Sequence, residues 1–282
     1  MTCVDRPSLL PPDPPSFGAL LRTWRTRRKC SQLDVALDAG ISQRHLSFLE
    51  SGRARPSRDM VLLLGTALDV PLRERNLLLH AAGFAPIYQQ RTLQDEDMKA
   101  VREVLALTLQ HHEPYPAMVV NRQWDMLMCN APAERFVALL GPPEEVWQRV
   151  DGSGRRNVMR MTFHPQGIQP RIRNWPQLAS LLLNRLHHEA AADPTHQALH
   201  QLLDEIVQFP GVNAQWRKQA WLNGMPPPVF PMEYALGERT LKVFSMVSTF
   251  GTALDATAEE LRVETFFPAD DFARSFFLAL AA

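Results

Sequence analysis

Residues 31–53, SQLDVALDAGISQRHLSFLESGR, decide the fold of the first part of this chain. Apolar residues recur at helical spacing on both sides of Gly40, which predicts two short helices joined by a turn. Ser31 and Ser42 each stand where a side-chain oxygen caps the start of a helix. Gly40 follows the first helix, where glycine adopts the left-handed backbone conformation at the least cost. The stretch therefore predicts a helix-turn-helix.

The outer surface of the second predicted helix, which Ser42 caps, carries hydrogen-bonding groups. Leu46 and Leu49 are spaced to face inward. The side chains that remain outside are Gln43, Arg44, Ser47 and Phe48. Amide, guanidinium and hydroxyl groups match the edges of base pairs in a major groove. We therefore expect this helix to contact DNA bases.

Helical patterns on both sides of the motif complete an all-α domain over residues 16–85. Start and stop signals predict one helix before the motif and two after it. Within the motif, Leu33, Ala36 and Leu37 are spaced as one apolar stripe, which we expect to face the core. The sequence therefore predicts a compact domain of five helices.

The motif resembles the repressor-type helix-turn-helix of the XRE family. The matching residues are Ser31-Gln32, Ala36, Gly40-Ile41-Ser42, Leu46-Ser47 and Glu50-Ser51-Gly52. The resemblance implies a regulator that binds a double-stranded DNA operator as a homodimer. The resemblance also implies a structural ion pair between Arg25 and Glu50, since members of this family pair an arginine and a glutamate at these positions.

Carried over position by position, the resemblance implies that Gln32 reaches a phosphate from the start of its helix. It implies that Gln43 and Arg44 read bases, and a bidentate contact of this kind is worth about 1–3 kcal/mol of discrimination. Phe48 would touch a thymine methyl or, alternatively, belong to the core. The full set of predicted DNA contacts is Gln32, Ser42, Gln43, Arg44, Ser47, Phe48, Arg53 and Arg55, the last two as phosphate anchors or ordinary solvated arginines.

The charge of the chain is balanced overall, with 30 basic and 30 acidic residues, but unevenly distributed. Residues 1–85 hold 12 basic and 8 acidic side chains, a net charge of +4, and the remainder hold 18 and 22, a net charge of −4. The positive part contains the helix-turn-helix, as neutralisation of DNA phosphates requires.

Residues 1–15 are rich in proline and predict a disordered arm rather than a signal peptide. No apolar run in the sequence is long enough to span a membrane.

The cysteines and histidines support neither a disulfide framework nor a metal centre. Cys3, Cys30 and Cys129 lie far apart without a C-x-x-C pair, which favours a reducing cytoplasm. His196 and His200 have the i, i+4 spacing of zinc ligands, but no H-E-x-x-H motif occurs. G-x-S-x-G, P-loop and G-x-G-x-x-G motifs are also missing, so we expect no cofactor and no enzyme activity.

Beyond a linker at residues 86–94, the pattern mixes helices and strands over residues 95–282. The expected elements are a helix at 95–112, a β-hairpin at 117–130, a helix capped by Asn130, a short helix around 158–161, helices at 175–192 and 195–209, a hairpin turning at Gly237-Glu238, a strand at 261–267 and a final helix after Asp270. This order predicts an α+β domain, with an antiparallel sheet covered by helices on one face.

This second part resembles the ligand-binding domain of MmyB-like transcription regulators. The segments that carry the resemblance are HHEPYPAMVVNRQWDMLMCNAPAERF at 111–136, RRNVMRMTFHP at 155–165, NWPQLASLLLNRL at 174–186 and TFGTALDATAEELRVETFFPAD at 249–270. The resemblance implies a PAS-like domain that binds a small-molecule effector, with which fatty-acid-like ligands are associated. Together the two resemblances imply a ligand-responsive transcription regulator.

A pocket of the PAS-like kind would lie between the sheet and its covering helices and would be mostly apolar. The candidate ligand contacts are Trp124, Met126, Met128, Asn130, Trp175, Arg185, Phe244 and Met246. For the aromatic and methionine residues the alternative is an ordinary core position. For Asn130 it is a helix cap, and for Arg185 an internal salt bridge. The alternative for the whole domain is a module that only dimerises or binds another protein.

Overall fold

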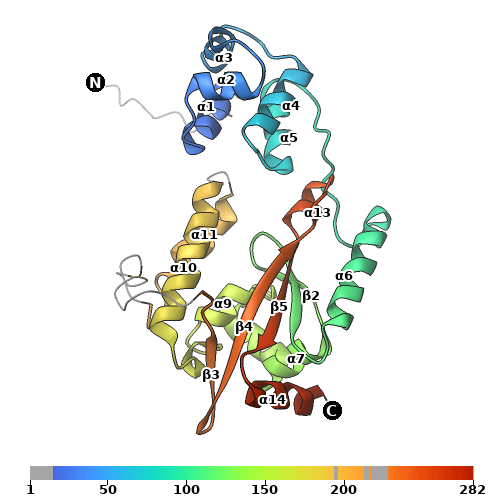
Figure 1. Ribbon diagram of the computed structural model, residues 1–282, viewed down its shortest axis with the longest axis vertical. Coiled ribbons are helices and arrows are strands. Elements are labelled where there is room, and N and C mark those ends of the chain that lie inside the picture. The colour runs from blue at the N-terminus through green and yellow to red at the C-terminus, as the bar shows by residue number, and fades with distance from the viewer. Residues whose placement is uncertain (1–14, 194–195, 213–215, 217–227, 282) are drawn as a thin grey trace, which may run out of the picture. The chain divides into compact units, whose positions relative to one another are not determined.

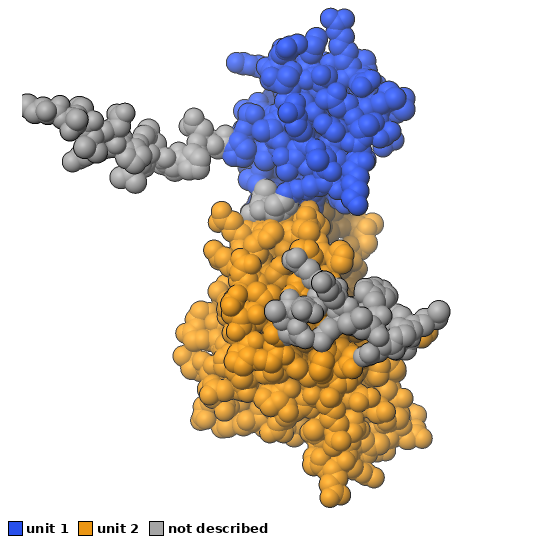
Figure 2. Space-filling model, turned by 90° about the vertical axis from the view of Figure 1, so that its left-hand side faces the viewer, with its two compact units in different colours: residues 1–90, 254–256 blue, residues 91–253, 257–282 orange. Residues whose placement is uncertain are grey.

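The computed structural model describes residues 15–193, 196–212, 216 and 228–281, so the predicted disordered arm, Pro15 apart, lies outside the described residues. The chain divides into two compact units, which Figure 2 distinguishes. The first contains residues 1–90 and 254–256, and the second contains residues 91–253 and 257–282. Within the described ranges, no helix is both long and apolar enough to cross a membrane.

The first unit is the predicted all-α domain (Figure 1). Its helices within residues 15–90 are α1 (Phe17–Arg27), α2 (Gln32–Asp38), α3 (Gln43–Glu50), α4 (Arg58–Ala67) and α5 (Leu72–Ala81). Leu21, Leu46 and Leu64 are fully buried in one apolar cluster that these helices share. The helix count and the helix-turn-helix order of α2 and α3 confirm the prediction.

The capping residues of the motif act as the sequence predicts. The Ser31 side chain accepts a hydrogen bond from the Asp34 backbone N–H, and the Asp34 carboxylate accepts one from the Ser31 N–H, a complete capping box. The Ser42 hydroxyl likewise accepts from the His45 N–H at the start of α3. Gly40 has a φ of +62°, the left-handed conformation expected between the two helices.

The predicted inward stripe of α2 is wrong in part. Leu33 and Leu37 are 49% and 70% exposed, whereas Val35, Ala36 and Ala39 are buried. The helix packs against its neighbours through Val35 and Ala36, and Ala39 at its C-cap is also buried. The larger leucines on either side of this contact are consequently left in solvent.

The described part of the second unit contains one antiparallel sheet with the strand order β2-β1-β5-β4-β3. The strands are β1 (Ala117–Val120), β2 (Met126–Cys129), β3 (Met232–Leu236), β4 (Arg239–Thr249) and β5 (Arg262–Pro268). The two predicted hairpins, β1–β2 and β3–β4, are confirmed. The last strand in the chain, β5, lies between them and pairs with both β1 and β4.

Helices surround this sheet (Figure 1). They are α6 (Lys99–His111), α7 (Ala131–Ala138), α8 (Pro143–Val150), α9 (Val158–Phe163), α10 (Trp175–Ala192), α11 (Gln197–Ile206), α13 (Ala256–Glu260) and α14 (Asp271–Ala281), with 3-10 turns at Glu96–Met98 and Gln169–Arg171. Helices α8 and α13 form where the sequence predicted no helix. The other helices correspond to predicted ones.

The expectation that helices cover only one face of the sheet is wrong. Successive side chains of a strand point to opposite faces, and both faces of β1 (AMVV) carry apolar side chains. Val119 and Val263 pack with Leu105 and Leu109 of α6. On the other face, Val120 belongs to a cluster with apolar residues of α10. Figure 1 accordingly shows α6 and α10 on opposite sides of the sheet.

Candidate DNA-reading helix and ligand cavity

The first turn of α3 presents the predicted base-reading groups to solvent. Ser42, Gln43 and Arg44 are exposed, and Ser47 is half-buried further along the helix. Leu46 and Leu49 are buried on the opposite side. A helix held by its inner face and polar on its outer face is the geometry that enters a major groove.

Phe48 lies outside the apolar core of the first unit. It is half-buried, and the described residues that form the core do not include it. The guanidinium carbons of Arg44 and Arg53 lie 5.3 and 5.9 Å from its ring centroid, within the range of cation–π attraction. Phe48 thereby joins α3 and the exit loop into one cationic patch, and Arg55 in the same loop is exposed.

Glu50, at the end of α3, is a buried carboxylate with several partners. Its oxygens accept from Arg25 Nε at 2.6 Å and Arg25 Nη2 at 3.0 Å, which confirms the predicted pair. The Gln32 amide also donates to Glu50, at 2.8 Å, so the side chain expected at a phosphate is engaged inside the domain. Burial alone would raise the pKa of Glu50, but the hydrogen bonds from Arg25 and Gln32 bring it below its usual value.

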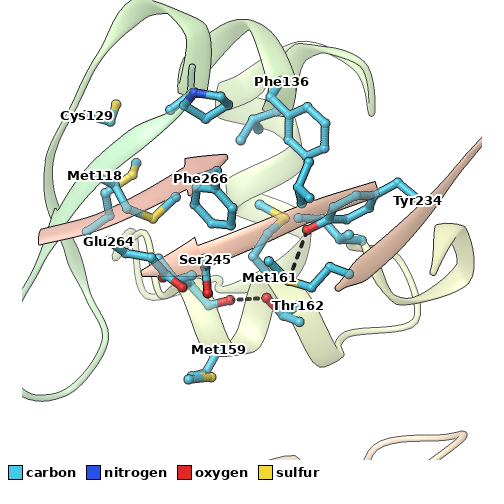
Figure 3. Close-up of a pocket in the computed structure, with 18 of the residues that line it drawn as sticks. Met118, Cys129, Phe136, Met159, Met161, Thr162, Tyr234, Ser245, Glu264 and Phe266 are labelled. Atoms are coloured by element: carbon cyan, nitrogen blue, oxygen red, sulfur yellow. Dashed lines mark hydrogen bonds between the residues drawn. The ribbon is translucent and has the colours of Figure 1, made fainter. Parts of the chain in front are cut away.

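The second unit contains a cavity of about 510 Å³. It lies between the sheet and helices α7 to α10, and residues of α14 also reach it (Figure 3). Most of the side chains around it are apolar, among them Met118, Phe136, Trp147, Met159, Met161 and Phe266. The volume falls in the range of small-molecule sites, roughly 300–1,000 Å³.

A few polar groups converge on this apolar space, most of them from the sheet. Glu264 of β5 is only 8% exposed and lies on the same face as Ser245 of β4, whose hydroxyl acts to lower the pKa of its carboxyl. The buried Tyr234 hydroxyl donates to the Met232 sulfur at 3.6 Å, which is a weak acceptor. Figure 3 shows these groups directed into the cavity. Such an arrangement suits a ligand that is largely apolar with a polar end.

Burial shifts the titration of the groups around the cavity. The pKa of Glu264 is raised by burial, against the opposing effect of the Arg185 charge. Burial and the nearby Glu134 raise the pKa of the Cys129 thiol to about 11, so this cysteine is an unreactive thiol at neutral pH.

Met126 and Arg185 line the cavity, and the other six predicted ligand contacts do not. The two methionines of β2 diverge because the β1–β2 register is irregular. Met126 pairs with Val120, whereas Met128 pairs with Val119 and packs on the α6 side. Residues two apart in a regular strand point to the same face, but a one-residue shift in the pairing register turns them to opposite faces.

Phe244 and Met246 lie on the face of β4 that points away from the cavity, and Met246 is 62% exposed. Residues of the other parity, Val243 and Ser245, line the cavity instead. The odd-numbered and the even-numbered residues of β4 both include apolar side chains that could face a core. The sequence alternation alone could not distinguish them.

Asn130 and Trp175 have structural partners. Asn130 caps α7 by accepting from the Ala133 N–H, which confirms the alternative role considered for it. The Trp175 indole donates to the Gly211 carbonyl at 2.9 Å, and its ring packs on Phe163 in the core.

Trp124 is buried beside the cavity at the centre of an ion-pair cluster. Its indole donates to Glu189 at 2.9 Å, and the guanidinium carbons of Arg185 and Arg262 lie 4.5 and 5.3 Å from its ring. Glu189 also pairs with both arginines, at 3.1 Å with Arg185 and 2.8 Å with Arg262. The alternative of an internal salt bridge for Arg185 is therefore confirmed.

Several cavity residues were missed from the sequence, notably Glu264, Ser245, Tyr234 and Phe136. For Glu264 a signal was present, because it is the only acidic residue of the strand RVETFFP, in which Val263, Phe266 and Phe267 are apolar. A charged residue in a strand with apolar neighbours on both faces is unusual unless it has a specific role. Among the described residues, no group of three or more His, Cys, Asp or Glu side chains is arranged to hold a metal ion.

Comparison with known families agrees with this geometry. The family model described as the MmyB-like transcription regulator ligand binding domain matches residues 101–280. A second family model, described as helix-turn-helix, matches residues 21–75. No curated protein matched the chain. Both matched families are regulatory, and the matches cover α3 and the residues that line the cavity.

Proposed function

The chain belongs to the MmyB-like transcription regulators, and we propose that it is a cytoplasmic bacterial regulator that binds its operator as a homodimer and senses an apolar or fatty-acid-like molecule in its second unit. The observation that carries this proposal is the combination of an exposed polar α3 with a mostly apolar cavity of about 510 Å³. The sheet with helices on both faces supports a PAS-like description of the second unit.

The DNA-binding part of the proposal assigns base contacts to Gln43 and Arg44. Both side chains are exposed at the start of α3, where recognition helices of this kind meet base edges. Arg53 and Arg55 are exposed in the following loop and supply positive charge for phosphates. Binding as a dimer would place two such helices in successive turns of the major groove.

The ligand-sensing part rests on the lining of the cavity. A solid protein-interaction module would fill this space with side chains, because protein interiors are close-packed and rarely contain voids much larger than a water molecule. An unfilled apolar space of this size is instead typical of a small-molecule site. The revised set of proposed ligand contacts is Met118, Met126, Phe136, Arg185, Tyr234, Ser245, Glu264 and Phe266.

Regulation follows if the ligand binds two arrangements of the dimer with different affinities. A ligand with equal affinity for both arrangements would shift nothing, however tightly it bound. We propose that filling the cavity changes the population of the arrangement whose α3 helices match the spacing of the two operator half-sites.

The test of the DNA-binding part is the double substitution Gln43→Ala/Arg44→Ala, assayed on operator and random DNA over a range of salt concentrations. Loss of two bidentate contacts should reduce the operator preference by roughly 10-fold to 100-fold for each contact. Nonspecific binding should keep its salt dependence. The matched control is Arg73→Ala/Gln90→Ala, which removes the same residue types outside α3. An unchanged operator preference in the first variant would show that α3 does not read the bases.

The test of the ligand-sensing part is native mass spectrometry of the purified full chain before and after solvent extraction. A ligand sensor should carry, or take up from an added fatty-acid series, one small molecule per chain. A protein that stays empty with every compound offered would favour the interaction module instead.

A further inference from the structure

Among the described residues that line the cavity, Glu264 is a buried acidic group for which no ion pair is found. Glu264 is 8% exposed, and its Cα is paired with those of Met118 in β1 and Val247 in β4. Ser245 supplies a hydroxyl, but the ion pairs found among the described residues do not include Glu264. Figure 3 shows its carboxyl beside Ser245, on the side of the cavity where Met159 lies.

A carboxyl in this position destabilises the empty domain. Taking a carboxylate out of water is costly unless a cation or several hydrogen bonds replace the lost hydration. One hydroxyl is too few, and burial accordingly raises the pKa of Glu264. An apolar side chain of the same size would pack there at lower cost, so the carboxyl is better explained by a ligand than by stability.

Among the described residues that line the cavity, the arginines already have acidic partners. Arg156 is engaged with Glu144, and Arg185 pairs with Glu189 at 3.1 Å. Glu134 adds a further acidic group, with the Cys129 thiol as its partner at 3.8 Å. A ligand carboxylate would therefore meet acidic groups and arginines that already have partners.

The uncharged lining of the cavity suits a cation. Phe136, Tyr234 and Phe266 contribute aromatic rings, whose faces attract cations more strongly when water is excluded. The methionines around them, such as Met118 and Met159, contribute polarisable sulfur atoms. The aromatic rings, the sulfur atoms and the buried carboxyl of Glu264 together complement a positively charged group on an apolar body.

We propose that the cavity binds an amphipathic amine, whose ammonium group pairs with Glu264 beside Ser245 while its hydrocarbon part fills the apolar space between the sheet and α7 to α10. This inference rests on the proposed function, because it names the chemical class that the proposed sensor recognises. It narrows the fatty-acid-like ligand to a molecule of similar body and opposite charge.

The experiment is isothermal titration of the full-length protein with three probes of one chain length, dodecylammonium, 1-dodecanol and dodecanoate, each kept below its micelle concentration. The amine should bind one per chain and about 10-fold tighter than the alcohol, the usual difference between a charge-assisted and a neutral hydrogen bond. Because binding would stabilise the ionised form of Glu264, a fraction of a proton should be released, and the heat should vary with the ionisation enthalpy of the buffer.

Two variants identify the group responsible. Glu264→Gln keeps the shape of the side chain and should reduce amine affinity to that of the alcohol, without buffer-dependent heat. Glu145→Gln, an exposed acid of α8 outside the cavity lining, makes the same change of charge and should leave the preference intact. If Glu264→Gln did not fold, the ranking of the three probes on the unmodified protein would still decide the matter.

Each other outcome has a definite meaning. If dodecanoate bound most tightly, the ligand would be an acid and not an amine, and the proposal that the second unit is a ligand sensor would remain. Equal binding of amine and alcohol, or an amine preference that survives Glu264→Gln, would overturn the role of Glu264. Failure of all three probes would overturn the amine, and an empty protein in native mass spectrometry would then remove the proposed sensor as well.

Discussion

Glu50 in the first unit and Glu264 in the second are both buried glutamates, but their surroundings differ. Glu50 of the DNA-binding unit accepts hydrogen bonds from Arg25 at 2.6 and 3.0 Å and from Gln32 at 2.8 Å. Glu264 of the second unit has the Ser245 hydroxyl and faces a cavity. The same residue type is a structural tie in one unit and a candidate binding group in the other.

The titration of the two carboxyls follows this difference. Burial acts to raise the pKa of both, but the hydrogen bonds and charge of Arg25 bring the pKa of Glu50 below its usual value. Within the described part of the chain no comparable partner offsets burial at Glu264, so its pKa stays raised. Burial of a charged group therefore does not by itself indicate function. A buried charged group is a better indicator of function when it faces a cavity and has no ion-pair partner there.

The largest expected effect comes from making Glu50 resemble Glu264. Arg25→Ala leaves a buried carboxylate without its bidentate partner, and breaking such a pair costs about 3–5 kcal/mol of stability. Hydrogen exchange of the full-length protein should show faster exchange in peptides of α1 to α3, with little change in the sheet. Unchanged exchange in the first unit would mean that the pair contributes little to its stability.

The reverse change makes the surroundings of Glu264 resemble those of Glu50. Glu189→Gln removes the acid that now holds Arg185 and Arg262, at a cost of about 1.5–3 kcal/mol for lost charged hydrogen bonds. Because the Glu189 charge raises the pKa of Glu264 and the Arg185 charge lowers it, the pKa of Glu264 should fall. A carbon-detected NMR titration of labelled glutamate would measure it, with Glu264→Gln to assign the signal. A higher pKa in the variant would contradict this account of the cluster.

Glu264→Gln should stabilise the empty second unit at alkaline pH. A carboxyl with a raised folded pKa contributes its stability fully below the unfolded pKa and loses it as pH rises through the folded value. The variant should therefore unfold at a higher Tm at pH 8, by about 2–4 °C for each kcal/mol in a unit of this size. The two Tm values should converge below about pH 4, where glutamate is protonated in either state. A lower Tm for the variant at pH 8 would mean that Glu264 is a structural group.

The smallest expected effect is that of Arg22→Ala, the outer neighbour of Glu50. The Arg22 side chain is 61% exposed and lies 3.6 Å from the buried carboxylate. Exposed ion pairs contribute about 0–1 kcal/mol and weaken with salt, so hydrogen exchange in the first unit should change little. This variant is also the control for Arg25→Ala. A large effect would show that net charge, rather than the bidentate geometry, keeps Glu50 ionised.

Local patterns in the chain predicted most of the secondary structure and the exposed polar face of α3. The serine caps, Gly40 and the spacing of Leu46 and Leu49 act within a few residues, so a window of sequence contains all the information they need. The hairpin at Gly237 is local in the same sense. The outward position of Gln43 and Arg44 follows from the helix period once the inner face is known.

The cavity was much less predictable, because it depends on contacts between distant residues. Glu264 reaches Ser245 only because β5 pairs with β4, and reaches Met118 only because β5 also pairs with β1. The separation of Met126 from Met128 depends on an irregular β1–β2 register. No periodicity within one strand contains that information.

By itself, the sequence determined the helix-turn-helix, the two hairpins, the order of helices and strands and the family resemblance, since these depend on neighbours along the chain. Only the tertiary structure decided which face of each strand meets the cavity, that α6 covers the opposite face, and which buried glutamate has a cation beside it. Apolar residues occur at both parities of β4, so packing against helices far along the chain selects the inner face. The charge partners of Glu50 and Glu264 are likewise set by the approach of separate elements, which is why two similar residues acquired different roles.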